Sequence, residues 1–486
     1  MAEQSLKDKT VKGVGWSAAD AFLGRGVTFL VGIVLARLLT PSEYGLIGIT
    51  TIFISVIDCI VDSGFSQAVI RKKDATNNDY NTMFITNMVL SVLMFLVLFV
   101  CAPAIARFFD RPELISLTRV MGSIVIIHAL SITQNTVLTK RIDFKTKTKA
   151  SVISAILSGI IGICMAFMGF GVWALVGQKI SKQLTNTIYL WAFNKWWPNL
   201  SFSKQSFNYM WGFGWKMLAS SILTNIWKQL YQVVVGKFYS PATLGQYSKA
   251  KEYSTLFSSN IDQIVNRVSY PVLSEMQDDK TRLKGAYRKI IKTTMFVTAV
   301  AMISMGAIAA PLIYCIIGPQ WHEAATYLPL ICISMSLYPL HSINLNMLKV
   351  QGRSDLYLVL EIVKKIIAIG PICIGIFVDI YWMVASSVVT GIIAYFLNSY
   401  NSGRLIGYSS WMQIKDIAPS YGLSFLIAVS VYFLKYLPFS YWIILPMQII
   451  VGSIVFFVVC KVSKNEDYVQ VKEMAMTFIG KLKKSK

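Results

Sequence analysis

Hydrophobic blocks of about 20 residues follow one another along almost the whole chain, separated by short polar loops. A helix of about that length crosses the roughly 30 Å hydrocarbon layer of a membrane. The pattern predicts an all-α integral membrane protein with about fourteen transmembrane helices. The predicted spans are 13–39, 44–65, 83–109, 114–138, 148–168, 172–193, 209–238, 244–272, 290–317, 324–348, 356–378, 381–402, 417–437 and 441–460.

Basic residues are concentrated in every second loop and in the tail. Lysine and arginine are about six times more frequent in this set of loops than in the other. The positive-inside rule places the basic loops in the cytoplasm, so we expect cytoplasmic N- and C-termini and an even number of spans. The first hydrophobic block is too long for a cleavable signal peptide.

Composition supports this interpretation and narrows the class of protein. The chain has 486 residues, 55% of them hydrophobic and 14% charged, with a formal net charge of +22. In a soluble protein this charge would suggest nucleic acid, but here the basic residues lie between membrane spans, so we expect no nucleic-acid partner. The sequence lacks the phosphate-binding loop, the zinc-hydrolase motif and the serine-hydrolase elbow. It therefore predicts a transporter rather than an enzyme, without a metal site.

An internal repeat relates the two halves of the chain. The Gly-x-Gly-Trp sequence of 13–16 recurs at 212–215, and the Pro and Gly of 40–45 recur at 240–245. Six spans separate the copies, so both have the same orientation, as in parallel repeats related by a pseudo-two-fold axis along the membrane normal. We expect two six-helix lobes, two further C-terminal helices and a basic, amphipathic cytoplasmic tail. The predicted bounds are 1–194, 195–402, 403–460 and 461–486.

Charged and polar residues within the spans gather in the first, second, seventh and eighth, which form the repeat-equivalent pairs. Each charge costs at least about 2.5–3.5 kcal/mol to insert, so each needs a partner or a water-filled cavity. Their helical spacing predicts three polar faces that line a cavity of net basic character, suited to an anion such as pyrophosphate. The alternative is structural pairing of Arg25 with Asp58 or Asp62, and of Lys251 with Asp262. The faces contain Thr51, Ser55, Asp58 and Asp62; Lys251, Thr255, Ser258 and Asp262; and Asn225, Lys228, Gln229 and Gln232.

Three stretches resemble the Wzx-type polysaccharide flippases of the multidrug/oligosaccharidyl-lipid/polysaccharide superfamily. They are 35–45, which contains Thr40-Pro41-Ser42-Glu43-Tyr44-Gly45, then 138–144 and 317–321. The resemblance implies two lobes around a central cavity in the bacterial cytoplasmic membrane. It also implies alternating-access export of an undecaprenyl-pyrophosphate-linked oligosaccharide for lipopolysaccharide, capsule or exopolysaccharide. The expected state is a monomer associated with polymerase machinery and surrounded by membrane lipid.

Cationic residues of the same four helices face the lipid pyrophosphate in such flippases. The matching candidates for anion binding are Arg25, Lys216, Lys228, Lys251 and Arg267. The second span departs from the pattern, since it offers acids instead of a cation. This suggests coupling to H⁺ or Na⁺, with no other cofactor. The polar cavity and coupling candidates are Asp20, Asp58, Asp62, Asn225, Gln232 and Asp262.

Two other classes of function stay open from the sequence. A cation-coupled multidrug exporter of the same superfamily would use an acidic cavity, for which Asp20, Asp58 and Asp62 are available. A membrane enzyme such as a sugar polymerase or an acyltransferase is the third class, although the short loops disfavour a polymerase.

Overall fold

The computed structural model describes residue 16 and residues 23–484 apart from residue 200. Asp20 lies outside the described residues, and so does most of the first half of the first predicted span. Within the described part the regular structure is entirely helical, as predicted. Contacts divide the chain into two compact units, Met1–Gly245 and Gln246–Lys486.

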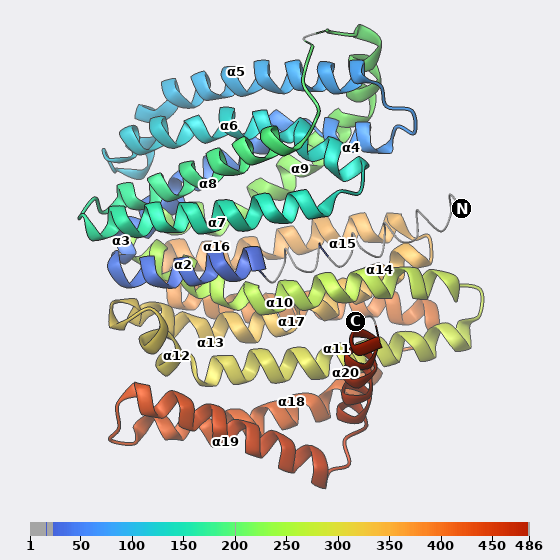
Figure 1. Cartoon of the computed structure of the whole chain (residues 1–486). Helices are drawn as coiled ribbons and strands as arrows, with labels where there is room; N and C mark the ends of the chain where they lie inside the picture. Colours follow the sequence, from blue (N-terminus) through green and yellow to red (C-terminus); the bar gives the residue numbers. More distant parts are fainter. Residues whose placement is uncertain (1–15, 17–22, 200, 485–486) are drawn as a thin grey trace. The chain divides into compact units, whose positions relative to one another are not determined.

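The helices of the first unit follow the predicted spans closely. In Figure 1, α5 to α8 lie side by side as a layer of long helices, and contacts connect α5 to α6, α6 to α8 and α7 to α8. Helix α9, which begins the second copy of the repeat, packs against α3, α4 and α5. The helices are α2 (Arg25–Leu38), α3 (Pro41–Asp62), α4 (Phe65–Arg71), α5 (Asn77–Phe109), α6 (Leu114–Lys140), α7 (Phe144–Phe167), α8 (Val172–Phe193) and α9 (Lys204–Phe238).

Helix α10 (Pro241–Glu275) begins in the first unit and continues into the second. The second unit consists otherwise of shorter helices, several of which are parts of one predicted span. They are α11 (Lys280–Ala307), α12 (Ala309–Ile316), η2 (Pro319–Trp321), α13 (His322–Ser336), α14 (Tyr338–Val350), α15 (Ser354–Ile367), α16 (Ile369–Phe377), α17 (Ile380–Ile406), α18 (Ser410–Tyr432), η3 (Phe433–Tyr436), α19 (Tyr441–Val462) and α20 (Glu466–Lys484).

Three predicted spans of the second unit are interrupted, at Ile308, Leu337 and Ala368. Each interruption lies two or three residues before a proline, which cannot donate its backbone hydrogen bond to the preceding turn. Proline alone does not decide the outcome, because α5 continues through Pro103, the repeat counterpart of Pro311. The interruptions therefore distinguish the second unit from the continuous helices α5, α6 and α7 of the first.

The two copies of the Pro and Gly motif meet reciprocally. A Cβ added to Gly45 would lie 1.8 Å from the carbonyl oxygen of Pro241, and one added to Gly245 would lie 1.9 Å from that of Pro41. Thr40 begins α3 with a capping box closed by Glu43, which orients the first copy. The glycines thus allow two helix starts to touch backbone to backbone, in the symmetric arrangement that a pseudo-two-fold repeat predicts.

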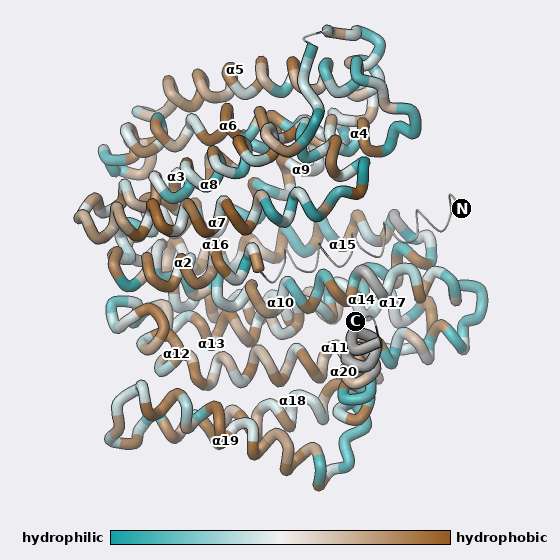
Figure 2. The backbone as a smooth tube through the Cα atoms, in the orientation of Figure 1, coloured by the Kyte–Doolittle hydropathy of each residue, from teal (hydrophilic) through white to brown (hydrophobic). Residues whose placement is uncertain are grey.

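The surfaces of the helices suit a membrane. Within the described residues, nine helical segments are long and apolar enough to span one, among them Asn77–Phe109 and Tyr441–Val462. Figure 2 shows hydrophobic colour along the middle of α5 to α7 and hydrophilic colour at the helix ends and loops. The protein is therefore a multi-pass membrane protein, while the number of fourteen spans is compatible with the helices and stays a prediction.

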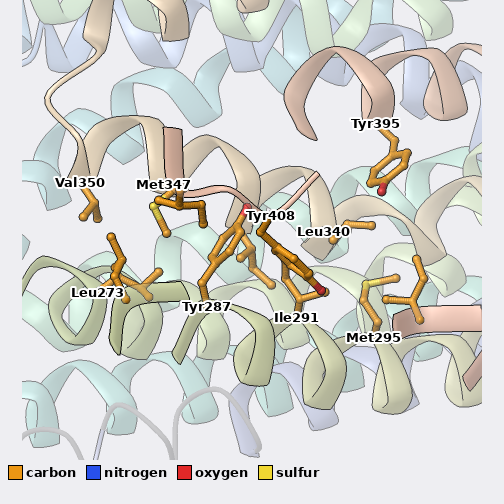
Figure 3. Close-up of a cluster of buried hydrophobic side chains, with 13 residues drawn as sticks. Leu273, Tyr287, Ile291, Met295, Leu340, Met347, Val350, Tyr395 and Tyr408 are labelled. Carbon is orange, nitrogen blue, oxygen red and sulfur yellow. The ribbon is translucent and has the colours of Figure 1, made fainter. Parts of the chain in front are cut away.

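A buried cluster at one end of the second unit holds α11, α14, α17 and α18 together. It contains Tyr287, Met347, Tyr395 and Tyr408 (Figure 3). The Tyr287 hydroxyl donates to Asn344 Oδ1 over 2.8 Å. This cluster fixes the helix ends next to the interrupted spans.

The predicted tail helix is present as α20, and its first turns pack on the protein. Tyr468 contacts the rings of Phe456 and Phe457, and Val471 joins the same cluster. Lys292 lies 3.5 Å from the carboxylates of both Glu466 and Asp467. Val471 therefore packs against α11, α18 and α19.

Candidate substrate and coupling sites

The polar face predicted on α3 is present, and its side chains bind neighbouring helices of the first unit. Thr51 Oγ1 accepts a hydrogen bond from Lys179 Nζ at 3.2 Å, and Ser55 Oγ accepts one from Gln229 Nε2 at 3.1 Å. Asp62 accepts a hydrogen bond from Ser66. Polar side chains of helix α3 thus make hydrogen bonds to α4, α8 and α9.

Asp58 has a specific partner that the sequence did not suggest. Its Oδ1 lies 3.0 Å from Nδ1 of His128 on α6, and both side chains are about one third exposed, at 29% and 35%. From the sequence we considered Arg25, and not His128, as a partner of Asp58. The observed contact pairs two ionisable groups within the helices, where each lowers the cost of burying the other.

The residues predicted on α9 divide into two sets. Lys216 and Lys228 are exposed, and Lys216 Nζ lies 5.9 Å from the ring centre of Trp215. Asn225 is half-buried and donates to Cys59 Sγ over 2.9 Å. Asp58, Asp62 and Lys228 all lie within electrostatic range of that thiol. A predicted anion-binding lysine and two predicted coupling acids therefore share one region of the first unit.

Other predicted residues are only partly placed by the structure. Arg25 is exposed at the first turn of α2, Gln232 is half-buried on α9, and Lys251 is half-buried with its Nζ 5.8 Å from the ring centre of Tyr247. Arg267 lies in α10, but its side chain is outside the described part of the structure. Their assignment to substrate binding stays a prediction.

The second unit holds Asp262 in a buried polar network between α10 and α14. Asp262 is 9% exposed, and Asn266 follows one helical turn later. Asn266 exchanges hydrogen bonds of 2.9 and 3.1 Å with Ser342 and accepts one from Asn346. One turn before Asp262, Ser258 Oγ donates to the carbonyl oxygen of Met335 over 2.8 Å.

The alternative pairing of Lys251 with Asp262 is wrong. Both residues lie on the continuous helix α10, eleven positions apart. At 1.5 Å per residue this separates them by about 16 Å along the axis, beyond the reach of two side chains.

Sequence reasoning missed the partners that lie on distant helices. His128 stands among apolar residues, so no polar periodicity marks it. Ser342 and Asn346 lie one helical turn apart, a short polar spacing that we did not single out from the sequence. Their importance depends on which helices pack together, and that follows from the fold. A single polar residue in an apolar span was the available signal for His128.

The second unit also contains an apolar cavity of about 300 Å³ between α11, α18 and α19. Its walls include Val300, Ile427 and Phe456, and the amide of Gln448 reaches its edge. None of the described residues predicted for anion binding lines it. The cavity is therefore separate from the polar residues described above.

Comparison with known families decides the identity of the chain at the family level. The family described as polysaccharide biosynthesis protein matches residues 34–326. The chain belongs to this family. The match contains α3, α9 and α10, the helices that bear the polar faces, and the two copies of the Pro and Gly motif.

The chain is similar to named proteins of several bacteria. It is 25% identical over 412 residues to the succinoglycan biosynthesis transport protein ExoT of Rhizobium meliloti, covering 85% of this chain and 81% of ExoT. It is 25% identical to the teichuronic acid biosynthesis protein TuaB of Bacillus subtilis, covering 72% and 73%. It is 21% identical to the lipopolysaccharide biosynthesis protein WzxC of Escherichia coli, covering 76% of each chain.

Solved structures show the same fold. The lipid II flippase MurJ in an inward closed conformation matches with a TM-score of 0.73 and 13% identity, over 92% of this chain and 98% of MurJ. An inward-facing multidrug transporter of the MATE family matches with a TM-score of 0.61 and 15% identity, over 79% and 98%. At such low identity these matches establish the fold that the resemblance implied, and the fold alone.

Proposed function

We propose that this protein is a flippase that moves an undecaprenyl-pyrophosphate-linked oligosaccharide across the bacterial cytoplasmic membrane by alternating access. Family membership carries the proposal, because the named relatives include a transport protein for one polysaccharide and biosynthesis proteins for two others. The fold shared with a lipid II flippase supports it. The asymmetry of basic loops supports cytoplasmic termini. We further propose that the protein works as a monomer associated with the polysaccharide polymerase machinery.

The exposed cations of the first unit are the part of the proposed site that the structure describes best. Arg25, Lys216 and Lys228 are exposed on helices that also hold polar contacts. Lysines bind phosphate as point charges and arginine binds it through a planar fork. A pyrophosphate linkage carries charge that these groups would neutralise during passage.

A cellular assay tests both the function and the site. In a strain that lacks its own flippase but makes the matching lipid-linked oligosaccharide, the wild-type protein should restore surface polysaccharide. Lys216→Glu combined with Lys228→Glu should abolish export while the protein stays in the membrane, because charge reversal repels the anion. Lys280→Glu combined with Lys289→Glu is the control, since both are exposed lysines outside the polar faces.

The outcomes of this assay distinguish the proposed function from the proposed anion-binding site. No restoration by wild-type protein that is present in the membrane would contradict the function. Full export by the Lys216 and Lys228 double variant would contradict the site alone. Increased resistance to cationic drugs on expression, without restored polysaccharide, would favour the multidrug exporter, for which Asp58 and Asp62 are the supporting feature.

A further inference from the structure

Asp262 is a buried acid whose hydrogen bonding is incomplete. The residue is 9% exposed, and its Oδ1 finds no hydrogen-bond donor among the described residues. An ionised carboxylate in this position would leave a charge-bearing oxygen without compensation inside a membrane helix. A buried carboxyl with such an oxygen is stable when the carboxyl is protonated, or when a bound ligand supplies the missing partner.

The groups around Asp262 are polar but uncharged. Asn266 stands one turn along α10, and Ser342 and Asn346 stand one turn apart on α14, so two short polar faces meet. The side chains of Asn266 and Ser342 also contact the Asp262 carboxyl. Amides and hydroxyls both donate and accept, so they can accommodate the carboxyl with or without a proton.

Ionisable groups of α14 and α15, the helix that follows it, have other partners. Lys364 pairs with Glu361, and His341 Nδ1 lies 3.4 Å from Nδ2 of Asn398. Tyr338 lies within electrostatic range of both Asp262 and Glu361. Among the described side chains, no cation forms an ion pair with Asp262.

The network lies beside an interrupted helix. Pro339 has no backbone N–H for the carbonyl of Met335, and that carbonyl accepts the Ser258 hydroxyl and the Leu337 N–H. The α13–α14 interruption at Leu337 therefore sits between the Ser258 contact and the Ser342 contact. In transporters, broken helices with freed carbonyls line the sites of coupling ions.

We propose that Asp262, supported by Asn266, Ser342 and Asn346 beside the α13–α14 interruption, binds a proton within the second unit. The inference rests on the proposed function, because the transport cycle is what would load and release this proton. A proton needs one oxygen and removes the charge. A metal ion would need several oxygens at once, whereas Asn266 Oδ1 already accepts two hydrogen bonds.

Infrared difference spectroscopy of the full chain in liposomes tests the site without transport. A change of pH should give a carboxylic-acid C=O band in wild-type protein that disappears in Asp262→Asn. Asparagine has the size of aspartate, so the fold is kept, and Asp58→Asn is the matched control that should retain the band. An unchanged spectrum in Asp262→Asn would overturn the proposal. A band removed by sodium at constant pH would overturn it in favour of a metal ion.

A transport assay connects the site to the cycle. Asp262→Asn should lose most of the increase in export rate that a proton gradient gives the wild-type protein. Gradient-dependent export that is unchanged in Asp262→Asn would overturn the role of the proton and leave the flippase function standing. A titrating Asp262 band in a wild-type protein that moves no lipid-linked oligosaccharide would contradict the flippase function alone.

Discussion

The acids within the membrane helices are held differently in the two units. In the first unit Asp58 pairs with His128, and Asp62 accepts a hydrogen bond from Ser66. In the second unit Asp262, the repeat counterpart of Asp62, has an oxygen without a donor among the described residues. The repeat thus preserves the position of an acid but not its partner. We infer that the acids of the first unit stabilise helix contacts and that Asp262 is the one suited to exchange a proton.

The same contrast is present one turn earlier in each helix. Asp58 of α3 contacts His128 of α6, and its counterpart Ser258 of α10 contacts the Met335 carbonyl of α13. Helices α3 and α6 correspond to the second and fourth predicted spans. Helices α10 and α13 correspond to the eighth and tenth, which are the repeat copies of those two spans. The first pair uses side chains across a continuous helix, and the second uses a backbone carbonyl freed by proline. The two repeats therefore make a contact between equivalent helices at equivalent positions, but with different chemical groups.

The largest effect is expected where the copies of the repeat touch. Gly45→Ala and Gly245→Ala should each destabilise the protein by about 3 kcal/mol or more, because the new Cβ would lie within 2 Å of a proline carbonyl oxygen. Thermal unfolding in detergent, followed by size-exclusion chromatography, measures the loss. If the contact is symmetric, the two variants should lose similar amounts.

Gly32→Ala is the matched control, because a Cβ there would meet nothing within 4 Å. It should be neutral or should stabilise α2 by up to about 1 kcal/mol, as alanine favours a helix. A Gly45→Ala protein as stable as Gly32→Ala would show that the two motifs do not touch in the membrane.

The positions of the helices were predictable from the sequence, and their partners were not. The span at 172–193 matches α8 at both ends, since hydrophobicity and length decide where a helix crosses a membrane. The interruption at Leu337 was missed, because Pro329 and Pro339 look alike in the sequence and only the second interrupts the helix. The spacing on α3 indicated which of its side chains are polar and make contacts, while their role in lining a cavity stays a prediction. His128 was not predicted as a partner of Asp58, because its role depends on α6 packing beside α3.

Substitutions at the acids of the two units should differ in their cost in unfolding free energy, and these costs should be smaller than those at Gly45 and Gly245. His128→Ala should cost about 1–3 kcal/mol of unfolding free energy, since it leaves the Asp58 carboxylate without its partner. Adding Asp58→Asn should recover part of this loss, and the double-mutant cycle in mixed micelles gives the coupling energy. Asp262→Asn should cost less than His128→Ala, since Oδ1 loses no donor. A loss for Asp262→Asn as large as that for His128→Ala would remove the contrast between the units.

The smallest effect is expected at an ion pair where two spans of the first unit end, between Lys237 in the last turn of α9 and Asp110 directly after α5. Lys237 Nζ lies 2.7 Å from Asp110 Oδ2, and the Asp110 side chain is 76% exposed. The Lys237 ammonium holds the pKa of Asp110 below its ordinary value. The pair therefore adds stability above the ordinary pKa of aspartate and loses it as the pH falls through the lowered pKa.

Lys237→Gln should accordingly lower the melting temperature slightly at pH 7, and this difference should disappear as the pH falls through the lowered pKa of Asp110. Salt should also reduce the difference. The comparison is Arg288→Gln in the second unit, where the Asp416 side chain is 11% exposed and accepts from Arg288 Nε and Nη2, each at 2.6 Å. A bidentate pair with a buried carboxylate is worth more than an exposed one, so Arg288→Gln should lose more stability at pH 7. Equal losses would mean that the two units do not differ in how they hold charges at their helix ends, which would confine the contrast to Asp58 and Asp262.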